Sequence, residues 1–514
     1  MVKKILSKPS MISLFLLTTL FSTGYSAVPA DFIASTDAVI DTLRMRDAVI
    51  QLKDATGAPL TGIRTVHFKQ IRSHFGFGAA IKYGDITNNK EKYWDALQTY
   101  FEWVTPEHEM KWDFIDQLED YSDFSEADSI IKWAHERNLK VRGHNLFWNE
   151  RLEFQPQWTD GLSGPEFKSA MQRRIESAMT HFKGQVEHWD IMNEIIHFQY
   201  GIIQERGLYD SLTGDPNIYP WVFQEARKYD PDVKMAVNEY QILTPNSDAI
   251  PYTNKIKEFI AGGATIDICG VEGHLSADID RLGYTQHLNE VAENIDLPIW
   301  LTEVDFQDSL GTRADVMEEI MRTAFAHPQV EGLVLWIWWE GRRWREALNS
   351  VVVDSQFVET DMGERYRTLR EKWTTDTTVM SDENGLVSLK GYHGKYLVSF
   401  PAYPDVAPDT MDLEPGADVF TKDLQTSVNY RKPAFSSNEI KFKGRSINLA
   451  LPTDITSPVY IATYSLSGKL LDKTPLFINN GTGYVPQKVP SGCFIYRIET
   501  ATEQLLTLKE ARLR

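Results

Sequence analysis

The sequence predicts an α/β protein, a (β/α)8 barrel followed by a small, sandwich-like β module at the C-terminal end. Two observations predict the barrel: eight short apolar runs alternate with helical stretches over about 300 residues, and nearly every run ends in polar or aromatic residues. A third observation predicts the module, because short β-like runs dominate after about residue 375. In such a barrel the C-terminal strand ends meet at one face, and active sites lie there.

The first 27 residues are expected to be a signal peptide. Lysines precede an apolar run from Met11 to Phe21 that is too short to span a bilayer, and a plausible cleavage site follows near Ser26 or Ala27. The alternative is a buried N-terminal helix. No later segment is long and apolar enough for a membrane span, so we expect a bacterial protein that is secreted or held at the cell surface.

Residues 45–375 are predicted to form the barrel domain, and about 45 to 72 should supply two strands around a turn-rich segment. The eight barrel strands are predicted at residues 74–81, 101–110, 140–148, 186–194, 233–240, 266–274, 298–306 and 330–339. The candidate helices between them are Ser125–Arg137, Pro165–His181, Thr253–Ala261, Tyr284–Glu293 and Arg313–Ala326.

Three segments are predicted after the barrel. Residues 376–400 are expected to form a β-hairpin extension, and residues 401–439, with several Pro and Asp, a linker or irregular loop. Residues 440–514 are expected to form the small β module, which resembles sorting or adhesion modules of secreted bacterial proteins. The alternatives are a carbohydrate-binding module, although residues 375–514 contain no Trp, and a passive β-domain.

The composition argues against several classes of partner and site. A formal net charge of −19 does not suit nucleic acid or an anionic membrane as the main partner. The chain has only two cysteines, Cys269 and Cys493, so it has no disulfide framework and no Cys-based metal site, and Cys269 is expected in the core. The 14 Trp suit stacking on flat apolar ligands, sugar faces among them.

Two glutamates at predicted strand ends fit the chemistry of glycosidic cleavage. That reaction needs one carboxyl group to protonate the leaving oxygen and another to attack the anomeric carbon or to activate water. Glu194 and Glu303 follow the fourth and seventh strands and suit these roles. Asn193 is expected to hold a sugar hydroxyl. His274 and Asp305 are expected to orient Glu303, with a buried structural histidine as the alternative for His274.

Six motifs follow one another at barrel spacing: PEHEMKWD (106–113), VRGHNLFW (141–148), HWDIMNE (188–194), GVEGH (270–274), WLTEVDF (300–306) and LWIWWEGRRW (335–344). They resemble the successive motifs of glycoside hydrolase family 10, the retaining endo-β-1,4-xylanases. The resemblance covers about residues 45 to 400. It implies a retaining mechanism, with carboxyl groups about 5–5.5 Å apart, and it implies no metal or organic cofactor.

The resemblance also implies roles for single residues. Glu194 matches the acid/base and Glu303 the nucleophile, while His274 and Asp305 match the residues that support the nucleophile. Burial beside Trp and the charge of Glu303 are expected to raise the pKa of Glu194. The matching substrate-binding positions are Glu107, Lys111, His144, Trp148 and Asn193 on the non-reducing side, Trp336 and Trp344 around the reacting sugar, and Tyr240 on the leaving side.

The sequence departs from the family pattern at three of these motif positions and, more mildly, at Glu239. His108 stands where the family usually has Asn, which bears on a distal sugar site, and Glu239 and Glu340 replace Asp. Glu272 stands where the family usually has Gln and adds a third carboxyl group. An ionised Glu272 would raise the pKa of Glu194, a protonated one could replace the missing amide donor, and a third possibility is a simple pairing with a basic neighbour.

We therefore expect a secreted retaining endo-β-1,4-xylanase with xylan or xylo-oligosaccharides as its partners. A related β-glycosidase on another β-linked glycan or glycoside is the alternative within the same class. The alternative from another class is a non-catalytic polysaccharide-binding surface protein, for which both Glu194 and Glu303 would be unnecessary. Cell-surface or secretion machinery is a further possible partner through the C-terminal module.

Overall fold

The computed structural model describes most of the barrel region and only strands beyond residue 425. The described residues are 27–61, 65–150, 154–198, 202–203, 207–275, 281–342, 344–345, 348–401, 406–416, 418–425, 442–443, 446–448, 459–464, 470–479, 482–484, 495–499 and 504–509. The predicted signal peptide and Cys493 lie outside them.

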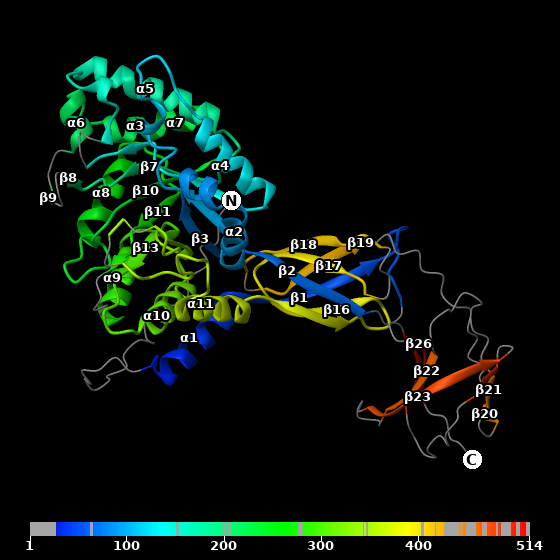
Figure 1. Ribbon diagram of the computed structural model, residues 1–514. Coiled ribbons are helices and arrows are strands. Elements are labelled where there is room, and N and C mark those ends of the chain that lie inside the picture. Colours follow the sequence, from blue (N-terminus) through cyan, green and yellow to red (C-terminus); the bar gives the residue numbers. More distant parts are fainter. Residues whose placement is uncertain are drawn as a thin grey trace, which may run out of the picture.

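Eight parallel strands close into the predicted barrel, which lies at the left of Figure 1. They are β3 (Gly76–Ile81), β4 (Trp103–Pro106), β5 (Lys140–Gly143), β7 (His188–Asn193), β10 (Lys234–Asn238), β11 (Ile268–Val271), β13 (Ile299–Phe306) and β14 (Val330–Leu335). The hydrogen-bonded order is β10-β11-β13-β14-β3-β4-β5-β7, and a β7–β10 pairing closes the ring. All eight predicted strands are confirmed. Short strands β6 (Phe147–Trp148) and β12 (His274–Leu275) extend the wall beside β7 and β13.

Helices surround the barrel, and the five predicted ones are present as α4 (Ser125–Glu136), α5 (Gly164–His181), α8 (Ala249–Ala261), α9 (Arg281–Asn294) and α10 (Arg313–Ala326). The structure contains further helices that were not predicted, namely α1 (Ala30–Leu43), α2 (Tyr83–Tyr100), α3 (Trp112–Ile115), α6 (Leu208–Thr213), α7 (Ile218–Tyr229) and α11 (Asp361–Lys372). In α2 a polar central stretch hides the signal, yet Ile86, Tyr93, Trp94, Leu97 and Tyr100 are buried at helical spacing.

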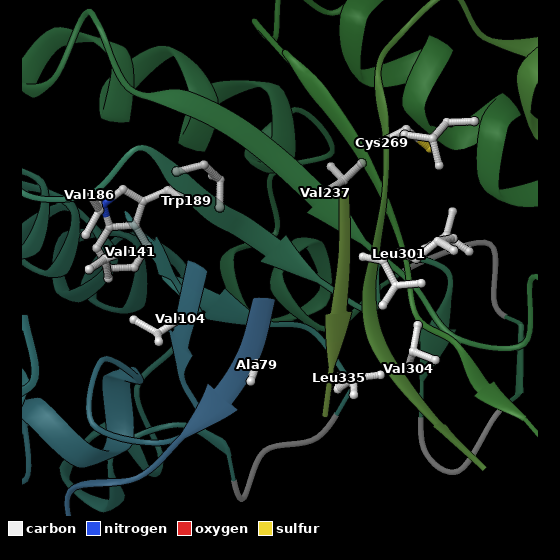
Figure 2. Close-up of a cluster of buried hydrophobic side chains, with 14 of the residues drawn as sticks. Ala79, Val104, Val141, Val186, Trp189, Val237, Cys269, Leu301, Val304 and Leu335 are labelled. Carbon is white, nitrogen blue, oxygen red and sulfur yellow. The ribbon is translucent and has the colours of Figure 1, made fainter. Parts of the chain in front are cut away.

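The main core lies between the strands and the surrounding helices. Figure 2 shows side chains of this core, and every barrel strand contributes at least one, namely Ala79, Val104, Val141, Trp189, Val237, Cys269, Leu301, Val304 and Leu335. Cys269 is fully buried among them, as predicted. Inside the barrel, at the end opposite the strand C-termini, Trp300 packs against the backbone of Gly76 and Gly332, where any Cβ would lie less than 3 Å from its ring.

A second β structure stands beside the barrel in Figure 1. We call it the β-module, and it is distinct from the C-terminal module predicted at residues 440–514. It consists of β1 (Met45–Lys53), β2 (Thr65–Ser73), β15 (Asp376–Met380), β16 (Leu386–Tyr392), β17 (Gly394–Ser399), β18 (Asp409–Leu413) and β19 (Phe420–Gln425). One sheet has the order β16-β1-β19 and the other β15-β2-β17-β18, and both contribute to one separate hydrophobic core.

The β-module corrects two boundaries expected from the sequence. The hairpin predicted at residues 376–400 is wrong, because β16 pairs with β1 in one sheet, whereas β15 and β17 both pair with β2 in the other. The predicted irregular linker at residues 401–439 contains β18 and β19. Buried Met411, Leu413 and Leu424 supply the strand signal in this segment, which its prolines and aspartates obscured.

The described strands after residue 440 form one antiparallel sheet with the order β20-β21-β24-β23-β22-β25-β26. Their bounds are β20 (Phe442–Lys443), β21 (Ser446–Asn448), β22 (Val459–Tyr464), β23 (Leu470–Asn479), β24 (Thr482–Tyr484), β25 (Ile495–Glu499) and β26 (Gln504–Lys509). None of the described helices is both long enough and apolar enough to cross a bilayer.

Candidate active site

The predicted site residues gather at the C-terminal ends of the barrel strands. Glu194 directly follows β7, and Glu303 lies within β13; β10 and β11 separate these two strands in the barrel wall. Both side chains belong to residues that are less than 8% exposed. The other predicted residues lie in or after β4, β5, β6, β7, β10, β11, β12, β13 and β14, so the barrel closure brings all of them to one face.

A chain of amide side chains connects the two glutamates. Asn193 Nδ2 donates to Glu194 Oε1 at 3.3 Å, and Asn238 Nδ2 donates to Asn193 Oδ1 at 2.9 Å. The same nitrogen of Asn238 lies 3.0 Å from Glu303 Oε1 and 2.9 Å from Glu272 Oε1. Asn238 at the end of β10 is therefore the centre of the carboxyl cluster. The sequence alone did not indicate this role.

Glu194 sits on a strained turn. Its φ is +56°, in the left-handed region that non-glycine residues rarely adopt. Its backbone N–H donates to Asn238 O at 2.7 Å, and Asn149 Nδ2 donates to its carbonyl oxygen at 3.2 Å. These bonds hold the turn so that the Glu194 side chain has one defined direction.

The Glu194 carboxyl group is in a setting that favours its protonated form. Burial raises its pKa well above the ordinary value, and the negative charges of Glu239, Glu150 and Glu303 add to this, while the nearby indole of Trp148 acts in the opposite direction. Within the described part of the chain, Glu194 Oε2 is buried and makes no hydrogen bond. A proton on this oxygen would be free for transfer to a ligand.

Glu303 accepts a hydrogen bond from His274, and Asp305 holds this histidine through its other ring nitrogen. His274 Nδ1 donates to Asp305 Oδ1 at 2.9 Å, and its Nε2 lies 3.3 Å from Glu303 Oε2. Burial lowers the pKa of His274, but the charge and hydrogen bond of Asp305, together with Glu303, outweigh burial and raise this pKa to about 10. His274 is therefore an imidazolium at neutral pH. Trp344 Nε1 donates to Asp305 Oδ2 at 2.6 Å and completes the chain.

A buried ion pair lies beneath this pair of glutamates. Arg142 of β5 bonds to Asp190 of β7, and both side chains are inaccessible to solvent. His144 Nδ1 donates to Asp190 Oδ2 at 2.9 Å, and burial lowers the pKa of His144, which keeps it neutral. Sequence reasoning assigned no role to Asp190. The signal was present, because Arg142 of β5 and His144, directly after β5, are two residues apart and so face the same side of an extended chain.

Glu272 is the third carboxyl group of the cluster, and its setting favours the neutral form. Burial raises its pKa well above the ordinary value, with further contributions from Glu303, Glu194, Glu239 and Asp190. Among the residues that the structure describes, its one basic neighbour within 4 Å is His274, whose Nε2 is 3.6 Å from Glu272 Oε2 and nearer to Glu303. Of the three expectations for Glu272, the protonated acid fits this geometry best.

Glu272, His274 and Glu303 also form the group in the described chain with metal-like spacing, since their ligand atoms lie within 4.8 Å of one another. The chemistry of the donor set does not suit a metal. Both ring nitrogens of His274 face carboxylate oxygens at hydrogen-bond distance, and a protonated imidazole has no lone pair to offer. Hydrogen bonding within the cluster accounts for the spacing.

The predicted substrate-binding residues line the rest of the face. Glu107 is the centre of an ionic group, with Lys82 Nζ at 3.3 Å, His108 Nε2 at 3.4 Å and Arg342 Nε at 3.5 Å. Sequence reasoning missed Lys82 and Arg342. Lys111 places its ammonium 4.1 Å from the ring centroid of Trp148.

Aromatic rings flank both glutamates. The ring of Trp336 meets His144 edge-on at 5.2 Å, and the exposed Trp344 lies 5.0 Å from the ring of His274. On the opposite side Tyr240 stacks on His197 at 4.2 Å, and its hydroxyl donates to Glu150 Oε1 at 3.4 Å. These surfaces suit the apolar faces of sugar rings.

Comparisons with known proteins match the barrel. The model of glycosyl hydrolase family 10 matches residues 68–365. The chain is 32% identical over 364 residues to the anti-sigma-I factor RsgI6 of Acetivibrio thermocellus, which covers 70% of this chain and 45% of that protein. It is 28% identical over 400 residues to endo-1,4-beta-xylanase 1 of Arabidopsis thaliana, covering 75% and 40%. The chain thus spans less than half the length of these curated relatives.

Solved structures share the fold. Xylanase 10B from Thermotoga petrophila, in complex with xylobiose, aligns with a TM-score of 0.53 at 24% identity and covers 58% of this chain and 94% of that one. Native xylanase 10B from Thermotoga maritima aligns with a TM-score of 0.52 over the same share of this chain. Both alignments support the (β/α)8 barrel.

Proposed function

Because this chain belongs to glycosyl hydrolase family 10, we propose that it is a retaining endo-β-1,4-xylanase in which Glu194 is the acid/base and Glu303 the nucleophile. The observation that carries the proposal is the unequal setting of the two groups. Glu194 has a buried, unbonded oxygen and a raised pKa, whereas Glu303 faces a cationic His274. Two carboxyl groups with such different environments suit an acid and a nucleophile.

In the first step Glu303 attacks the anomeric carbon and Glu194 gives its proton to the leaving oxygen. Attack neutralises the negative charge of Glu303, and a covalent glycosyl-enzyme forms. The His274–Asp305 pair holds the attacking oxygen in place. Asn193, hydrogen-bonded to Asn238, presents its amide to a sugar hydroxyl whose bond strengthens in the transition state.

In the second step Glu194 acts as a base. The charge of Glu303 has disappeared, so one of the causes of the raised pKa of Glu194 is gone, and Glu194 can take a proton from the incoming water. Water attack releases the sugar with its original configuration. Glu107, His108, Lys111, His144 and Trp148 are proposed to bind the non-reducing side, Trp336 and Trp344 to enclose the reacting sugar, and Tyr240 to stack on the leaving side.

The test is the release of reducing sugars from xylan by the full chain. Glu303→Ala should lose activity by at least about three orders of magnitude, because the covalent route is lost. Asp128→Asn, which removes an exposed His181 partner far from the site, is the matched control and should stay active. An active Glu303→Ala variant, or an inactive wild type on xylan, glucan and aryl xylosides, would refute the proposal.

Two alternatives have separate outcomes in the same assay. Activity on aryl xylosides without activity on the polymer would favour a related β-glycosidase. One relative is named for an anti-sigma factor and not for hydrolysis, which keeps a binding protein as the alternative from another class. Binding of xylan that persists unchanged in Glu194→Gln, with no turnover by the wild type, would support it.

Secretion and the role of the C-terminal sheet belong to the proposal as well. They rest on the lysine-flanked apolar run near the start of the sequence and on the β-rich pattern after residue 440. A mature protein that starts near Ala27 in the culture medium would support secretion. A full-length N-terminus retained in the cytosol would contradict it.

A further inference from the structure

A buried chain of three ionisable side chains lies behind the acid/base turn. Asp248, directly before α8, accepts from His197 Nε2 at 3.2 Å, and His197 Nδ1 donates to Glu239 Oε1 at 2.7 Å. The side chains of His197 and Glu239 are inaccessible to solvent, and that of Asp248 is 19% exposed. Neither of the proposed catalytic steps uses these three side chains.

Glu239 bonds directly to the backbone that carries Glu194. Its Oε2 accepts from Ile196 N at 2.8 Å, two residues beyond Glu194, and its Oε1 also accepts from its neighbour Tyr240 N at 3.0 Å. The turn between β7 and Ile196 contains the left-handed φ of Glu194, a strained conformation that persists only where surrounding bonds hold it. Glu239 is one of the groups that hold it.

The geometry also indicates that Glu239 carries a negative charge. Three N–H groups donate to its two oxygens, and each of these hydrogen bonds is stronger when the carboxyl group is ionised. Burial raises the pKa of Glu239 above its ordinary value, and the bond and charge of His197 limit that rise. Burial lowers the pKa of His197, but Glu239 and Asp248 outweigh it and raise that pKa, as expected for an imidazolium between two carboxylates.

We propose that the Asp248–His197–Glu239 chain is a positioning device for the acid/base, in which the Glu239 carboxylate both holds the Glu194 turn and keeps the Glu194 proton in place by its charge. The proposal rests on the function proposed above. Among the charged groups that raise the pKa of Glu194, Glu239 has a larger effect than Glu150 and Glu303.

Other ionisable groups face the same space and must be considered. Glu272 on the β11 side and the Tyr240 hydroxyl both interact with Glu194. Glu150, after β6, bonds to Tyr240. Since these groups are unchanged when Glu239 alone is replaced, a change in the Glu194 titration reports the Glu239 charge.

The test compares Glu239→Gln with Glu239→Asp in the full chain. Glutamine keeps an oxygen for the turn but removes the charge, so the basic limb of kcat/KM on a xylo-oligosaccharide should move about one pH unit or more to lower pH. Aspartate keeps the charge on a shorter side chain, so it should keep the basic limb and lower kcat at every pH. Glu187→Gln, which alters a carboxylate that accepts Val141 N at the other end of the barrel, is the matched control and should change neither.

A second substrate separates lost acidity from a general structural defect. An aryl β-xylobioside with a dinitrophenol leaving group needs no proton from Glu194. At pH values above the shifted limb, Glu239→Gln should therefore lose activity on the oligosaccharide and keep it on the dinitrophenyl substrate. Equal losses on both substrates, or an unmoved basic limb, would overturn the proposal.

A readout without turnover covers the case in which xylan is not the substrate. The raised pKa of Glu194 means that the folded protein retains a proton which the unfolded chain releases above about pH 4. The wild type should therefore lose melting temperature relative to Glu194→Gln as pH rises from about 4 to the pKa of folded Glu194, and the difference should level off above that pKa. In the Glu239→Gln background the loss should begin at the same pH, but it should level off at a lower pH and be smaller in total. An identical profile in both backgrounds would refute the role of Glu239 whatever the substrate is.

Discussion

At the scale of single residues, the site is a cluster of carboxyl groups with too few neighbouring cations to stabilise all of them in the ionised form. Asp190 has Arg142, Glu239 has His197, and Glu303 and Asp305 share His274. Among the described residues, Glu194 has no ion-pair partner, and Glu272 lies 3.6 Å from a His274 that Glu303 and Asp305 approach more closely. The pKa of each is raised. The carboxyl groups that pair with a cation are therefore expected to be ionised, and those without one to keep their protons.

Glu272→Gln should move the basic limb of the pH–rate profile to lower pH. Glu272 is neutral at low pH, but it titrates together with Glu194, so once either group loses its proton the negative charge raises the pKa of the other. Glutamine cannot ionise and retains a donor, so it removes the repulsion that arises when Glu272 loses its proton within the basic limb. Measurement of kcat/KM from pH 4 to 9 tests this, and an unchanged profile would mean that Glu272 does not set the pKa of Glu194.

His274 should make stability depend on pH above neutrality. Its folded pKa of about 10 lies above the unfolded value of about 6.5, so the stabilisation is fully present below pH 6.5 and is lost as pH rises through 10. Thermal unfolding of the wild type and His274→Asn should therefore show a difference that shrinks between pH 7 and pH 10. A constant difference over this range would mean that His274 is neutral in the folded protein.

At the scale of elements, the eight strands were predictable because each carries an apolar run with a polar end. The partners within the site were less predictable, since a bond such as Asn238 to Glu303 joins residues 65 positions apart. Glu194 was found from its strand end, but its left-handed turn and the bond from Ile196 to Glu239 depend on the placement of β10 beside β7. Register between strands, which the sequence pattern leaves open, decides these contacts.

The glycines at the base of β3 and β14 should be intolerant of a side chain. A Cβ at Gly332 would lie 2.4 Å from Trp300 Cε3, inside a packed barrel that cannot expand. Gly332→Ala should destabilise the protein by about 1–3 kcal/mol in denaturant unfolding. Gly84→Ala, at a position with open space around it, is the control and should be neutral; equal unfolding midpoints for the two variants would contradict the packing account.

At the scale of the whole molecule, the β-module joins the two ends of the barrel segment. Strands β1 and β2 precede the barrel, and β15 to β19 follow it, yet their side chains form one core. The sequence predicted strands in both places but not their pairing, because β1 and β16 are more than 300 residues apart. Each half alone exposes apolar residues that the other half covers.

Truncation should reveal this dependence. A chain that ends after Gln425 retains the whole β-module and should keep the melting temperature and activity of the full chain. A chain that ends after Thr375 leaves Ile50, Phe68 and their neighbours without their partner strands and should aggregate or melt at lower temperature. The same melting temperature for both truncations would show that β15 to β19 do not stabilise β1 and β2, and it would contradict this account.

The central claim, a covalent step at Glu303 with Glu194 as its acid/base, is tested most directly by trapping the intermediate. The full chain would be incubated with a 2-deoxy-2-fluoro-β-xylobioside that bears a dinitrophenol leaving group, and the labelled peptide mapped by mass spectrometry. The account predicts one fluoroxylobiosyl group per chain, attached to the peptide that contains Glu303. A protein that hydrolyses xylan but carries the label on another residue, or accumulates none, would contradict it.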